Sequence, residues 1–354
     1  MAFTLTSLSA LTEAGFDSII DVRAPSEFAE DHLPGAINLA VLTDEERAQV
    51  GTIYKQDSPF KARKIGAALV AQNAARHLQG ALADKDGGWR PLVYCWRGGQ
   101  RSGSFASILA QIGWRVDVLD GGYRSYRRLV VNRLYTSDFP AKVILLDGNT
   151  GTAKTEVLAR LAARGVQVLD LEGMAEHRGS ALGGQGAQPS QKAFESRLAA
   201  GVAALDPMRP VVVEAESSRI GRINLPPRLF AAMRAAPRVL IEAPVAARAA
   251  YLCSAYADLI QDPDAMKTRL QRLVRLQGHD RVRAWMQLAE DRQHRRLAED
   301  LIRHHYDPRY QRVRGDDAEP MVTVQAGTLS PEGIAELSRD VAAALHTLDD
   351  GVPR

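Results

Sequence analysis

The stretch that decides the fold of this chain is Ile144–Thr155, which reads ILLDGNTGTAKT. An apolar run from Ile144 is typical of a buried strand, and the sequence EVLARLAARG after Thr155 is typical of a helix. A glycine-containing turn between strand and helix that ends in Lys-Thr is the pattern of a P-loop, whose amides cradle phosphates. Lys154 would neutralise phosphate charge, and Thr155 can hold Mg²⁺. The predicted phosphate-binding residues are Gly148, Asn149, Thr150, Gly151, Thr152, Ala153, Lys154 and Thr155.

One position departs from the usual motif, because Ala153 stands where a glycine normally precedes the lysine. We expect its methyl group to be tolerated only if the residue keeps a negative φ and leaves room beside the phosphate. A strand–turn–helix that binds no phosphate is the alternative interpretation of the same stretch.

Two further groups of polar residues are candidates for this site. The run Val211–Val213 reads as a strand, and Glu214 and Glu216 at its end could face a metal or the substrate, or be solvated. Residues 177–186 are too glycine-rich for regular structure, and His177 and Arg178 in them are candidate substrate ligands. A surface loop without function is the alternative for that segment.

A second anion site is predicted around Cys95. The strand-like run Leu92–Tyr94 delivers this cysteine into a glycine-rich loop, and Arg101 follows six positions later. Such a loop can turn its amides toward an anion, the arginine can bind an oxyanion with two hydrogen bonds, and a thiol there should ionise easily. We predict Cys95 and Arg101 as catalytic and the loop between them as the anion site: Trp96, Arg97, Gly98, Gly99 and Gln100.

The organisation of the chain indicates two α/β domains. Its 354 residues exceed one typical domain, and strands alternate with helical stretches in both halves, which favours parallel sheets. We predict a first domain over residues 1–125, a helical linker over 126–140, where Phe139-Pro140 breaks the helix, and a P-loop domain over 141–354. A mostly helical, arginine-rich part begins near residue 245.

Composition limits the class of protein. Hydrophobic residues make up 45% and charged residues 25%, as in ordinary globular proteins, and the net charge is only +3. The two cysteines cannot form a disulfide framework and are typical of a reducing cytoplasm. We expect no signal peptide, no membrane span, no cluster of metal ligands and no tightly bound cofactor.

One local region is strongly basic. Between Lys267 and Arg296 there are nine lysines and arginines against three acids, with an apolar stripe that predicts amphipathic helices. Such a face suits a nucleic-acid backbone, although a solvated charged face is equally consistent with the pattern. The candidate RNA-binding residues are Arg269, Arg272, Arg275, Arg281 and Arg283.

These segments resemble a known family. Residues 21–28 (DVRAPSEF), 32–38 (HLPGAIN) and the Cys95 loop resemble a rhodanese domain. Residues 171–173, 177–180, 188–191, 194–195, 214–217 and 306–310, together with the P-loop, resemble tRNA 2-selenouridine synthases. The resemblance implies a rhodanese-like parallel-sheet domain followed by a P-loop NTPase-like domain with a helical, arginine-rich C-terminal part. Ala153 departs from the family pattern, as does His305, where a tyrosine is usual.

The resemblance also implies an activity. Members of this family are transferases that act on tRNA carrying a 5-substituted 2-thiouridine at the wobble position. They replace its sulfur with selenium from selenophosphate and attach a geranyl group from geranyl diphosphate to that sulfur as an intermediate. The Cys95 loop would then hold selenophosphate, and the P-loop geranyl diphosphate rather than ATP. An enzyme that produces selenophosphate is an implied partner.

Several alternatives stay open at this point. Cys95 could take up selenium as a perselenide or act on the tRNA adduct. Its six-residue spacing from Arg101 matches Cys-based phosphatases and suits a tetrahedral oxyanion, so a phosphatase or sulfurtransferase fused to a nucleotide-binding, kinase-like domain is a competing interpretation. A non-catalytic RNA-binding protein is another, but it would have no need of Cys95, Arg101, Lys154 and Thr155 together.

Overall fold

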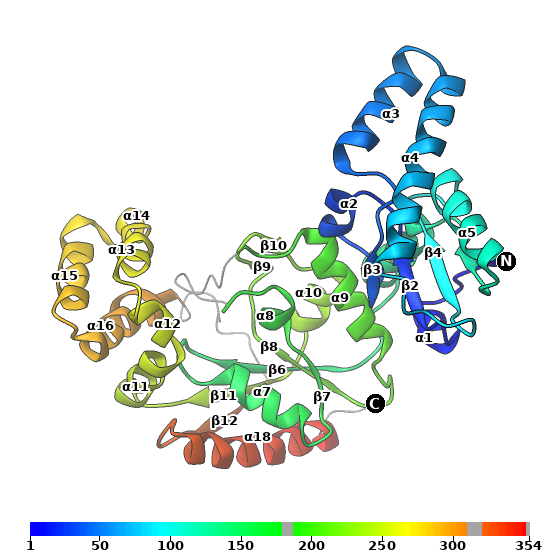
Figure 1. Cartoon of the computed structure of the whole chain (residues 1–354). Coiled ribbons are helices and arrows are strands. Elements are labelled where there is room, and N and C mark those ends of the chain that lie inside the picture. The colour runs from blue at the N-terminus through cyan, green and yellow to red at the C-terminus, as the bar shows by residue number, and fades with distance from the viewer. Residues whose placement is uncertain (179–186, 310–320, 352–354) are drawn as a thin grey trace. The chain divides into compact units, whose positions relative to one another are not determined.

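The chain folds into two compact units, each built on a parallel sheet. The computed structural model describes residues 1–178, 187–309 and 321–351. The first unit comprises Met1–Asp138 with Pro189–Ala204, and the second Phe139–Gln188 with Leu205–Arg354 (Figure 1). The predicted α/β class with two parallel sheets is confirmed.

The sheet of the first unit has five strands in the order β1-β5-β4-β2-β3, and every neighbouring pair is parallel. Its central strands are short apolar runs covered on both faces, which is typical of parallel sheets. The strands are β1 (Ala2–Phe3), β2 (Ser18–Asp21), β3 (Ala36–Asn38), β4 (Pro91–Tyr94) and β5 (Asp117–Leu119). The carboxyl end of β4 delivers Cys95 to the edge where ligands bind in such sheets.

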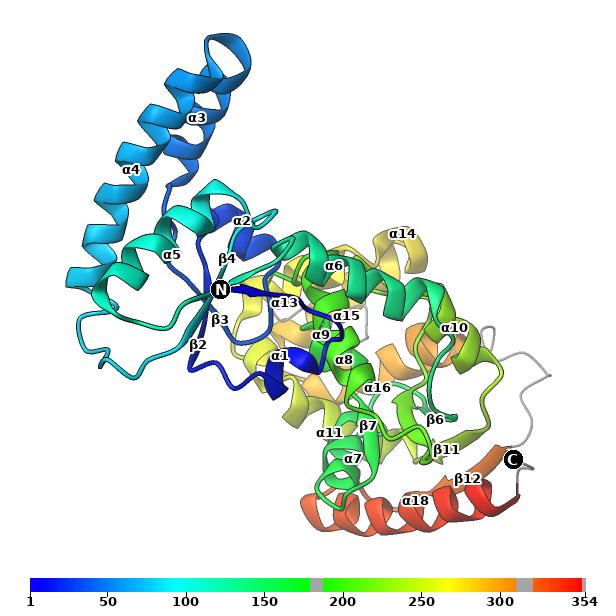
Figure 2. The ribbon, with the colours of Figure 1, turned by 90° about the vertical axis from the view of Figure 1, so that its right-hand side faces the viewer.

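Helices cover this sheet, and two of them form a projecting hairpin. The helices are α1 (Ala10–Glu13), α2 (Pro25–Glu30), α3 (Asp44–Gln56), α4 (Pro59–Gln79), α5 (Gln100–Ile112) and α6 (Tyr123–Val131). Ser58 caps α4 by accepting a hydrogen bond from the Lys61 amide, and Pro59 starts the helix. Helices α3 and α4 lie side by side and extend from the sheet (Figure 2).

The stretch predicted as a linker is helical and continues the first unit. Helix α6 passes into a π-helix, η1 (Asn132–Thr136). Both pack against α9 (Gln191–Ala203), which lies far along the sequence. Glu195 of α9 accepts hydrogen bonds from Arg127 and Tyr135, and Ser196 donates one of 2.8 Å to buried Asp31. A helix from the P-loop half of the sequence therefore completes the first unit.

The second unit has a five-stranded parallel sheet in the order β12-β11-β6-β8-β7. The strands are β6 (Val143–Gly148), β7 (Gln167–Leu169), β8 (Val211–Glu214), β11 (Arg238–Glu242) and β12 (Met321–Gln325). Leu146 and Val212 of the sheet pack with Val157 of α7 (Lys154–Ala162) and Leu337 of α18 (Pro331–Gly351) in one core. Helices α7 and α18 therefore cover the same face of the sheet.

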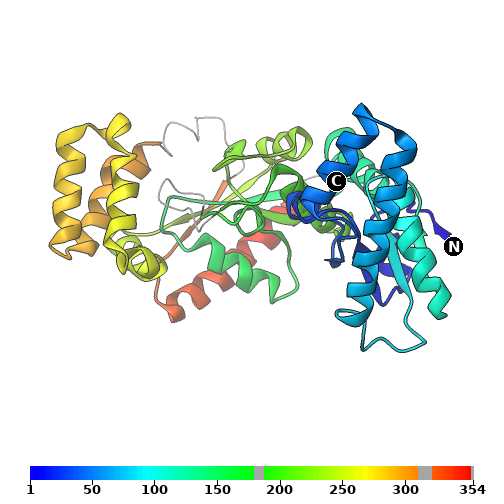
Figure 3. The same ribbon diagram turned by 45° about the horizontal axis from the view of Figure 1, so that its top comes forward.

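The helical part is an insertion between two neighbouring strands of the second sheet. It runs from β11 through α11 (Val245–Ala255), α12 (Ala257–Ile260), α13 (Pro263–Gln271), α14 (Val274–Gln277), α15 (His279–Glu290), α16 (His294–Leu301) and the π-helix η2 (Ile302–Tyr306). Buried Trp285 and Leu270 lie in its own hydrophobic core. Figure 3 shows the helices of this part, in yellow and gold, grouped together. Strand β12 then returns to the sheet, which the sequence analysis did not predict.

The remaining elements are short. They are α8 (Leu171–Met174), α10 (Pro227–Arg234) and the antiparallel pair β9 (Arg219–Ile220) and β10 (Ile223–Asn224). Among the described residues, no helix is both long and apolar enough to cross a membrane.

Candidate functional site

The P-loop connects β6 to α7, as the sequence predicts, but the conformation of Ala153 differs from the expectation. Ala153 has a φ of 59° and a ψ of 30°, which is left-handed backbone, so the expected negative φ is wrong. Such a residue costs about 1–2 kcal/mol of backbone strain. Ala153 is nevertheless buried and belongs to the same hydrophobic core cluster as Val157.

The two polar residues at the start of α7 lie where a phosphate loop needs them. The Lys154 ammonium donates a hydrogen bond of 2.7 Å to the Gly148 carbonyl. The Thr155 hydroxyl donates one of 3.2 Å to Oε1 of Glu214, at the end of the neighbouring strand β8. The predicted candidate Glu214 therefore lies beside the P-loop.

Three glutamates gather near Lys154. Burial, together with the charges of Glu172 and Asp170, raises the pKa of Glu214 to about 8. Burial and the neighbouring Glu216 raise the pKa of Glu172 to about 8, and burial raises that of Glu216, which is hydrogen-bonded to Glu172. The sequence analysis missed Glu172 as a site residue. Its signals were its place after the second strand of the unit and the family resemblance of residues 171–173.

The arrangement of Thr155 and Glu214 fits a Mg²⁺ ion. Oε2 of Glu214 is buried without a hydrogen-bond partner, so one carboxylate oxygen is unused. Magnesium sites beside P-loops commonly use one hydroxyl, one carboxylate and the phosphates of the ligand. Within residues 1–178, 187–309 and 321–351, no three His, Cys, Asp or Glu side chains form a metal cluster, so the phosphates would have to complete the site.

The loop opens into a polar pocket. Its volume is about 1030 Å³, including its opening to solvent, and Lys154, Thr155, Glu172, His177 and Arg178 line it. The structure thus brings the predicted His177 and Arg178 to the phosphate loop. Burial and the charge of Arg269 lower the pKa of His177, which favours the neutral imidazole. Arg178 pairs with Asp258 at 3.1 Å and lies 4.8 Å from the centre of the Tyr256 ring.

The ion pair between Arg248 and Asp307 contacts the P-loop and was not predicted from the sequence. Arg248 of α11 is buried and donates hydrogen bonds of 3.0 and 2.8 Å to the Thr150 carbonyl. It also pairs with Asp307, at 2.7 and 2.9 Å. Asp307 in turn accepts a hydrogen bond of 3.0 Å from the Asn149 side chain. Residues about 100 and 158 positions from the loop therefore fix its shape.

The Cys95 loop has the geometry of an anion site at the N-terminus of a helix. The thiol accepts hydrogen bonds from the Gly99 amide at 3.3 Å and the Ser102 hydroxyl at 3.2 Å. A Cβ atom on Gly122, whose φ is 58°, would lie 2.3 Å from the Cys95 carbonyl oxygen. Only glycine therefore fits at position 122. Neither Ser102 nor Gly122 was predicted as a site residue from the sequence.

These contacts favour the thiolate. Burial alone would raise the pKa of Cys95, but hydrogen bonds from Ser102 and from the Arg97 backbone, with the charge of Arg101, outweigh it and lower the pKa. The N-terminal end of α5 adds to this effect. Cys95 is therefore suited to act as a nucleophile.

The other predicted loop residues occupy different surroundings. Arg101 donates a hydrogen bond of 2.8 Å from one guanidinium nitrogen to Glu27 of α2. This bond fixes the position of the Arg101 side chain. The Trp96 ring stacks on Tyr123 with centroids 5.2 Å apart. Arg97, Gly99 and Gln100 are exposed.

The predicted RNA-binding arginines divide into two groups. Arg272, Arg275, Arg281 and Arg283 are exposed on or beside helices α13–α15. Arg269 is half-buried and close enough to His177 to affect its pKa, so it belongs beside the P-loop pocket. Residues 179–186 of the predicted substrate loop lie outside the described residues.

Comparisons with known proteins cover both units. Residues 141–330 match the tRNA 2-selenouridine synthase AAA domain, and residues 4–129 match the rhodanese-like domain. A tRNA 2-selenouridine synthase of Alcanivorax borkumensis is 32% identical over 349 residues, covering 89% of this chain and 92% of that protein.

Other relatives align over a shorter length. Proteins of the same name from Psychromonas ingrahamii and Nitrosomonas europaea are 36% and 37% identical, covering 69% and 65% of this chain. The chain spans 66% and 61% of their respective lengths. A solved N-terminal domain of a putative ATP/GTP binding protein from Clostridium difficile 630 is 33% identical, covering 37% of this chain and 99% of that chain with a TM-score of 0.31.

Proposed function

The chain belongs to the tRNA 2-selenouridine synthase family, and we propose that it replaces the sulfur of a wobble 2-thiouridine in tRNA with selenium from selenophosphate. The observation that carries the proposal is that one chain holds both a thiol of lowered pKa, Cys95, and a P-loop whose Thr155 contacts the buried Glu214. Two anion sites of different kinds suit a reaction that uses two phosphorus-containing substrates.

In the first step, the P-loop would bind geranyl diphosphate. The thiocarbonyl sulfur of the base attacks C1 of the geranyl group, the C1–O bond breaks, and diphosphate leaves with the electron pair. The loop amides and Lys154 stabilise the charge on that leaving group. When bound by Thr155 and Glu214, Mg²⁺ would neutralise further diphosphate charge. The S-geranyl base then has a thiol as leaving group instead of sulfide.

In the second step, Cys95 would act on selenophosphate. A perselenide on Cys95 would require selenium to be oxidised by two electrons and phosphorus to leave as phosphite, so an oxidant would be needed to give phosphate. Attack of the Cys95 thiolate on phosphorus needs no oxidant: an S–P bond forms, the Se–P bond breaks, and hydrogen selenide leaves with the electron pair. It then attacks C2 of the base and expels geranylthiol.

The surroundings of Cys95 support attack on phosphorus. Amides of the exposed loop residues Arg97, Gly99 and Gln100 would bind phosphate oxygens together with Arg101. Water would later hydrolyse the phosphocysteine, and the Ser102 hydroxyl at 3.2 Å stabilises the departing thiolate. Hydrogen selenide leaves as an anion and needs no acid, unlike the alcohol of a phosphate ester. This difference favours selenophosphate over the phosphatase interpretation.

The tRNA would lie against the exposed arginines of helices α13–α15, such as Arg272 and Arg275. We infer a cytoplasmic protein that works with an enzyme supplying selenophosphate.

Mass spectrometry of the wobble nucleoside tests the function. The full chain is incubated with tRNA that carries a 5-substituted 2-thiouridine. We expect S-geranyl-2-thiouridine with geranyl diphosphate alone, and 2-selenouridine when selenophosphate is also present. An unchanged nucleoside in both reactions would overturn the proposal. Turnover of ATP and of phosphate esters without tRNA would support the competing phosphatase–kinase interpretation.

A further inference from the structure

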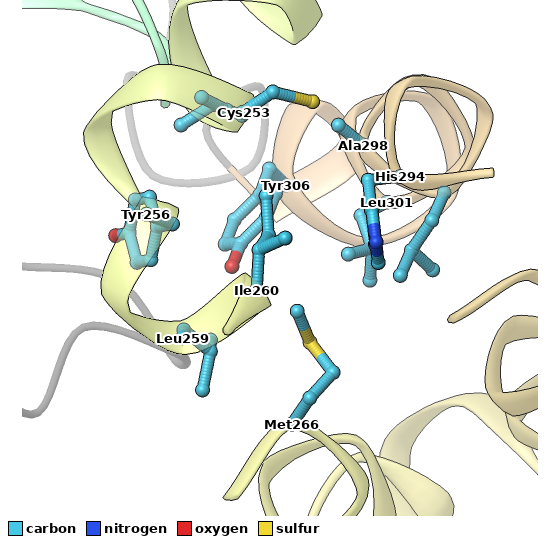
Figure 4. A pocket seen from close by; sticks show the side chains of 11 residues that line it. Cys253, Tyr256, Leu259, Ile260, Met266, His294, Ala298, Leu301 and Tyr306 are labelled. Atoms are coloured by element: carbon cyan, nitrogen blue, oxygen red, sulfur yellow. The ribbon is translucent and has the colours of Figure 1, made fainter. Parts of the chain in front are cut away.

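A second pocket adjoins the phosphate loop, and its surroundings are apolar. Its free space, counted together with its opening to solvent, is about 480 Å³, and it lies between helices α11, α12, α13, α16 and η2 (Figure 4). Its walls include Leu259, Met266, Leu297 and Leu301, and almost all of its accessible surface is apolar. A cavity of this kind binds hydrocarbon and offers a nucleotide base few hydrogen-bond partners.

The two pockets share residues on one helix face. Leu252 and Tyr256 line both the polar pocket of the P-loop and the apolar pocket. They are four positions apart, so they follow one another along the same side of α11 and its C-terminal end. Leu252 lies directly against the phosphate loop, because a Cβ atom on Gly151 would be only 3.0 Å from its Cγ. The side chains of this face therefore lead from the loop to the cavity.

A cation marks the junction between the pockets. The Arg178 guanidinium lies 4.8 Å from the centre of the Tyr256 ring and also lines the polar pocket. The polar pocket is thus lined by charged side chains, Lys154, Glu172 and Arg178 among them, whereas the described lining of the apolar pocket contains no Asp, Glu, Lys or Arg. The arrangement is complementary to a ligand with an anionic head and a hydrocarbon tail.

We propose that the apolar pocket holds the hydrocarbon chain of a prenyl diphosphate whose phosphates lie on the P-loop. The inference rests on the proposed function and adds to it the location of the chain. Cys253, the second cysteine, lies on the wall of this pocket next to Ala298. A bound chain would cover its thiol.

Cysteine labelling tests the location without disturbing the pocket. In a Cys95→Ser variant, Cys253 is the only thiol of the chain, and its reaction with a small maleimide can be timed at pH 8.5. We expect geranyl diphosphate to slow the reaction at least fivefold, while inorganic diphosphate changes it less than twofold. Equal labelling with and without geranyl diphosphate would overturn the inference. Equal protection by inorganic diphosphate or by ADP would do the same, since neither carries a prenyl chain.

Binding constants separate this inference from the proposed function. Burial of a ten-carbon chain should make geranyl diphosphate bind at least tenfold more tightly than inorganic diphosphate. Ala298→Phe, which fills the pocket, should abolish that advantage and leave the affinity for inorganic diphosphate unchanged. Exposed Ala284→Phe is the matched control and should preserve both affinities.

The outcomes of the binding measurement are distinct. If the wild-type chain binds inorganic diphosphate but gains nothing from the geranyl group, the pocket inference fails and the phosphate role of the P-loop stands. If it binds neither ligand, the geranyl step of the proposed function fails as well. If Ala298→Phe does not fold, the labelling of Cys253 still decides the location.

Discussion

Arg248 and Asp307 form a two-bond ion pair, at 2.7 and 2.9 Å, that fixes the P-loop from two distant parts of the chain. Arg248 is 4% exposed, and Asp307 is the residue directly after η2. Removal of one partner would leave the other charge buried and poorly compensated, which is more costly than loss of a surface ion pair.

We therefore expect Asp307→Ala to destabilise the second unit by about 2–3 kcal/mol and to weaken binding of inorganic diphosphate. Urea unfolding and diphosphate titration measure the two effects. The matched surface control is Asp280→Ala, which removes the partner of exposed Arg283 and should cost less than about 0.5 kcal/mol. Similar losses for both variants would contradict the supporting role of Asp307.

The contact between Ser102 and Cys95 predicts a pH effect. The Ser102 hydrogen bonds help to lower the pKa of Cys95, so Ser102→Ala should move the midpoint of Cys95 alkylation to higher pH. A Cys253→Ala background leaves one thiol to follow. Ser104→Ala changes an exposed serine of the same helix and should not move the midpoint. A shared midpoint for all three chains would show that Ser102 does not set the thiol pKa.

The two anion sites should separate the two chemical steps. We expect Lys154→Ala to slow geranylation about 10²–10³-fold, because the lysine stabilises leaving diphosphate, and to spare selenation of tRNA that is already geranylated. Cys95→Ala should abolish selenation and retain geranylation. Nucleoside analysis after each half-reaction gives both rates, and full selenation by Cys95→Ala would rule out a role for the thiolate.

Labelled selenophosphate should also reveal the phosphocysteine. We expect a rapid release of hydrogen selenide, close to one equivalent per chain, with retention of radioactive phosphate on Cys95 after acid quenching. Ser102→Ala should lengthen the life of the adduct, since Ser102 stabilises the departing thiolate. Label bound through selenium instead of phosphorus would contradict this step.

The glutamates near Lys154 predict a dependence of stability on pH. The pKa of Glu172 is about 8 in the folded chain against an ordinary value of 4.5, so the folded state holds a proton that the unfolded state releases. The free energy of unfolding should therefore fall as pH rises from about 4.5 to about 8. Glu172→Gln keeps the neutral form and should reduce this fall, while Glu214 still contributes to it with the same sign.

Urea-unfolding midpoints at pH 5.5 and 8.5 in magnesium-free buffer measure this effect. Exposed Glu290→Gln is the control and should behave as the wild-type chain does. An identical pH dependence for Glu172→Gln and the wild type would show that Glu172 ionises normally in the folded state.

The exposed arginines predict how tRNA binding responds to salt. Replacement of Arg272 and Arg275 by alanine should weaken tRNA binding about three- to tenfold. The slope of log affinity against log salt concentration should also become shallower, by the amount expected for the loss of about one to two phosphate contacts. Replacement of Arg160 and Arg164, which are exposed on or just after α7, removes the same charge elsewhere. Equal losses for the two pairs would indicate an effect of net charge and not of a binding face.

Local motifs made much of this molecule predictable. The P-loop and the Cys95 loop could be identified because each consists of consecutive residues between a strand and a helix. The left-handed φ of Ala153 could not, since non-glycine residues rarely adopt it and nothing in the local sequence marks it. Neither could Arg248 and Asp307, because the fold brings them to the loop across about 100 and 158 residues.

Helix α9 has a consequence for any attempt to dissect the protein. The chain passes between the two units at residues 138–139, 188–189 and 204–205. A fragment that stops at residue 138 would leave Arg127 without Glu195 and would expose buried Asp31. A fragment that starts at residue 139 would carry α9 without the first unit, in which its Phe194 and Leu198 are buried. Neither boundary separates two independently folding domains. Halves expressed separately should therefore fold incompletely and aggregate.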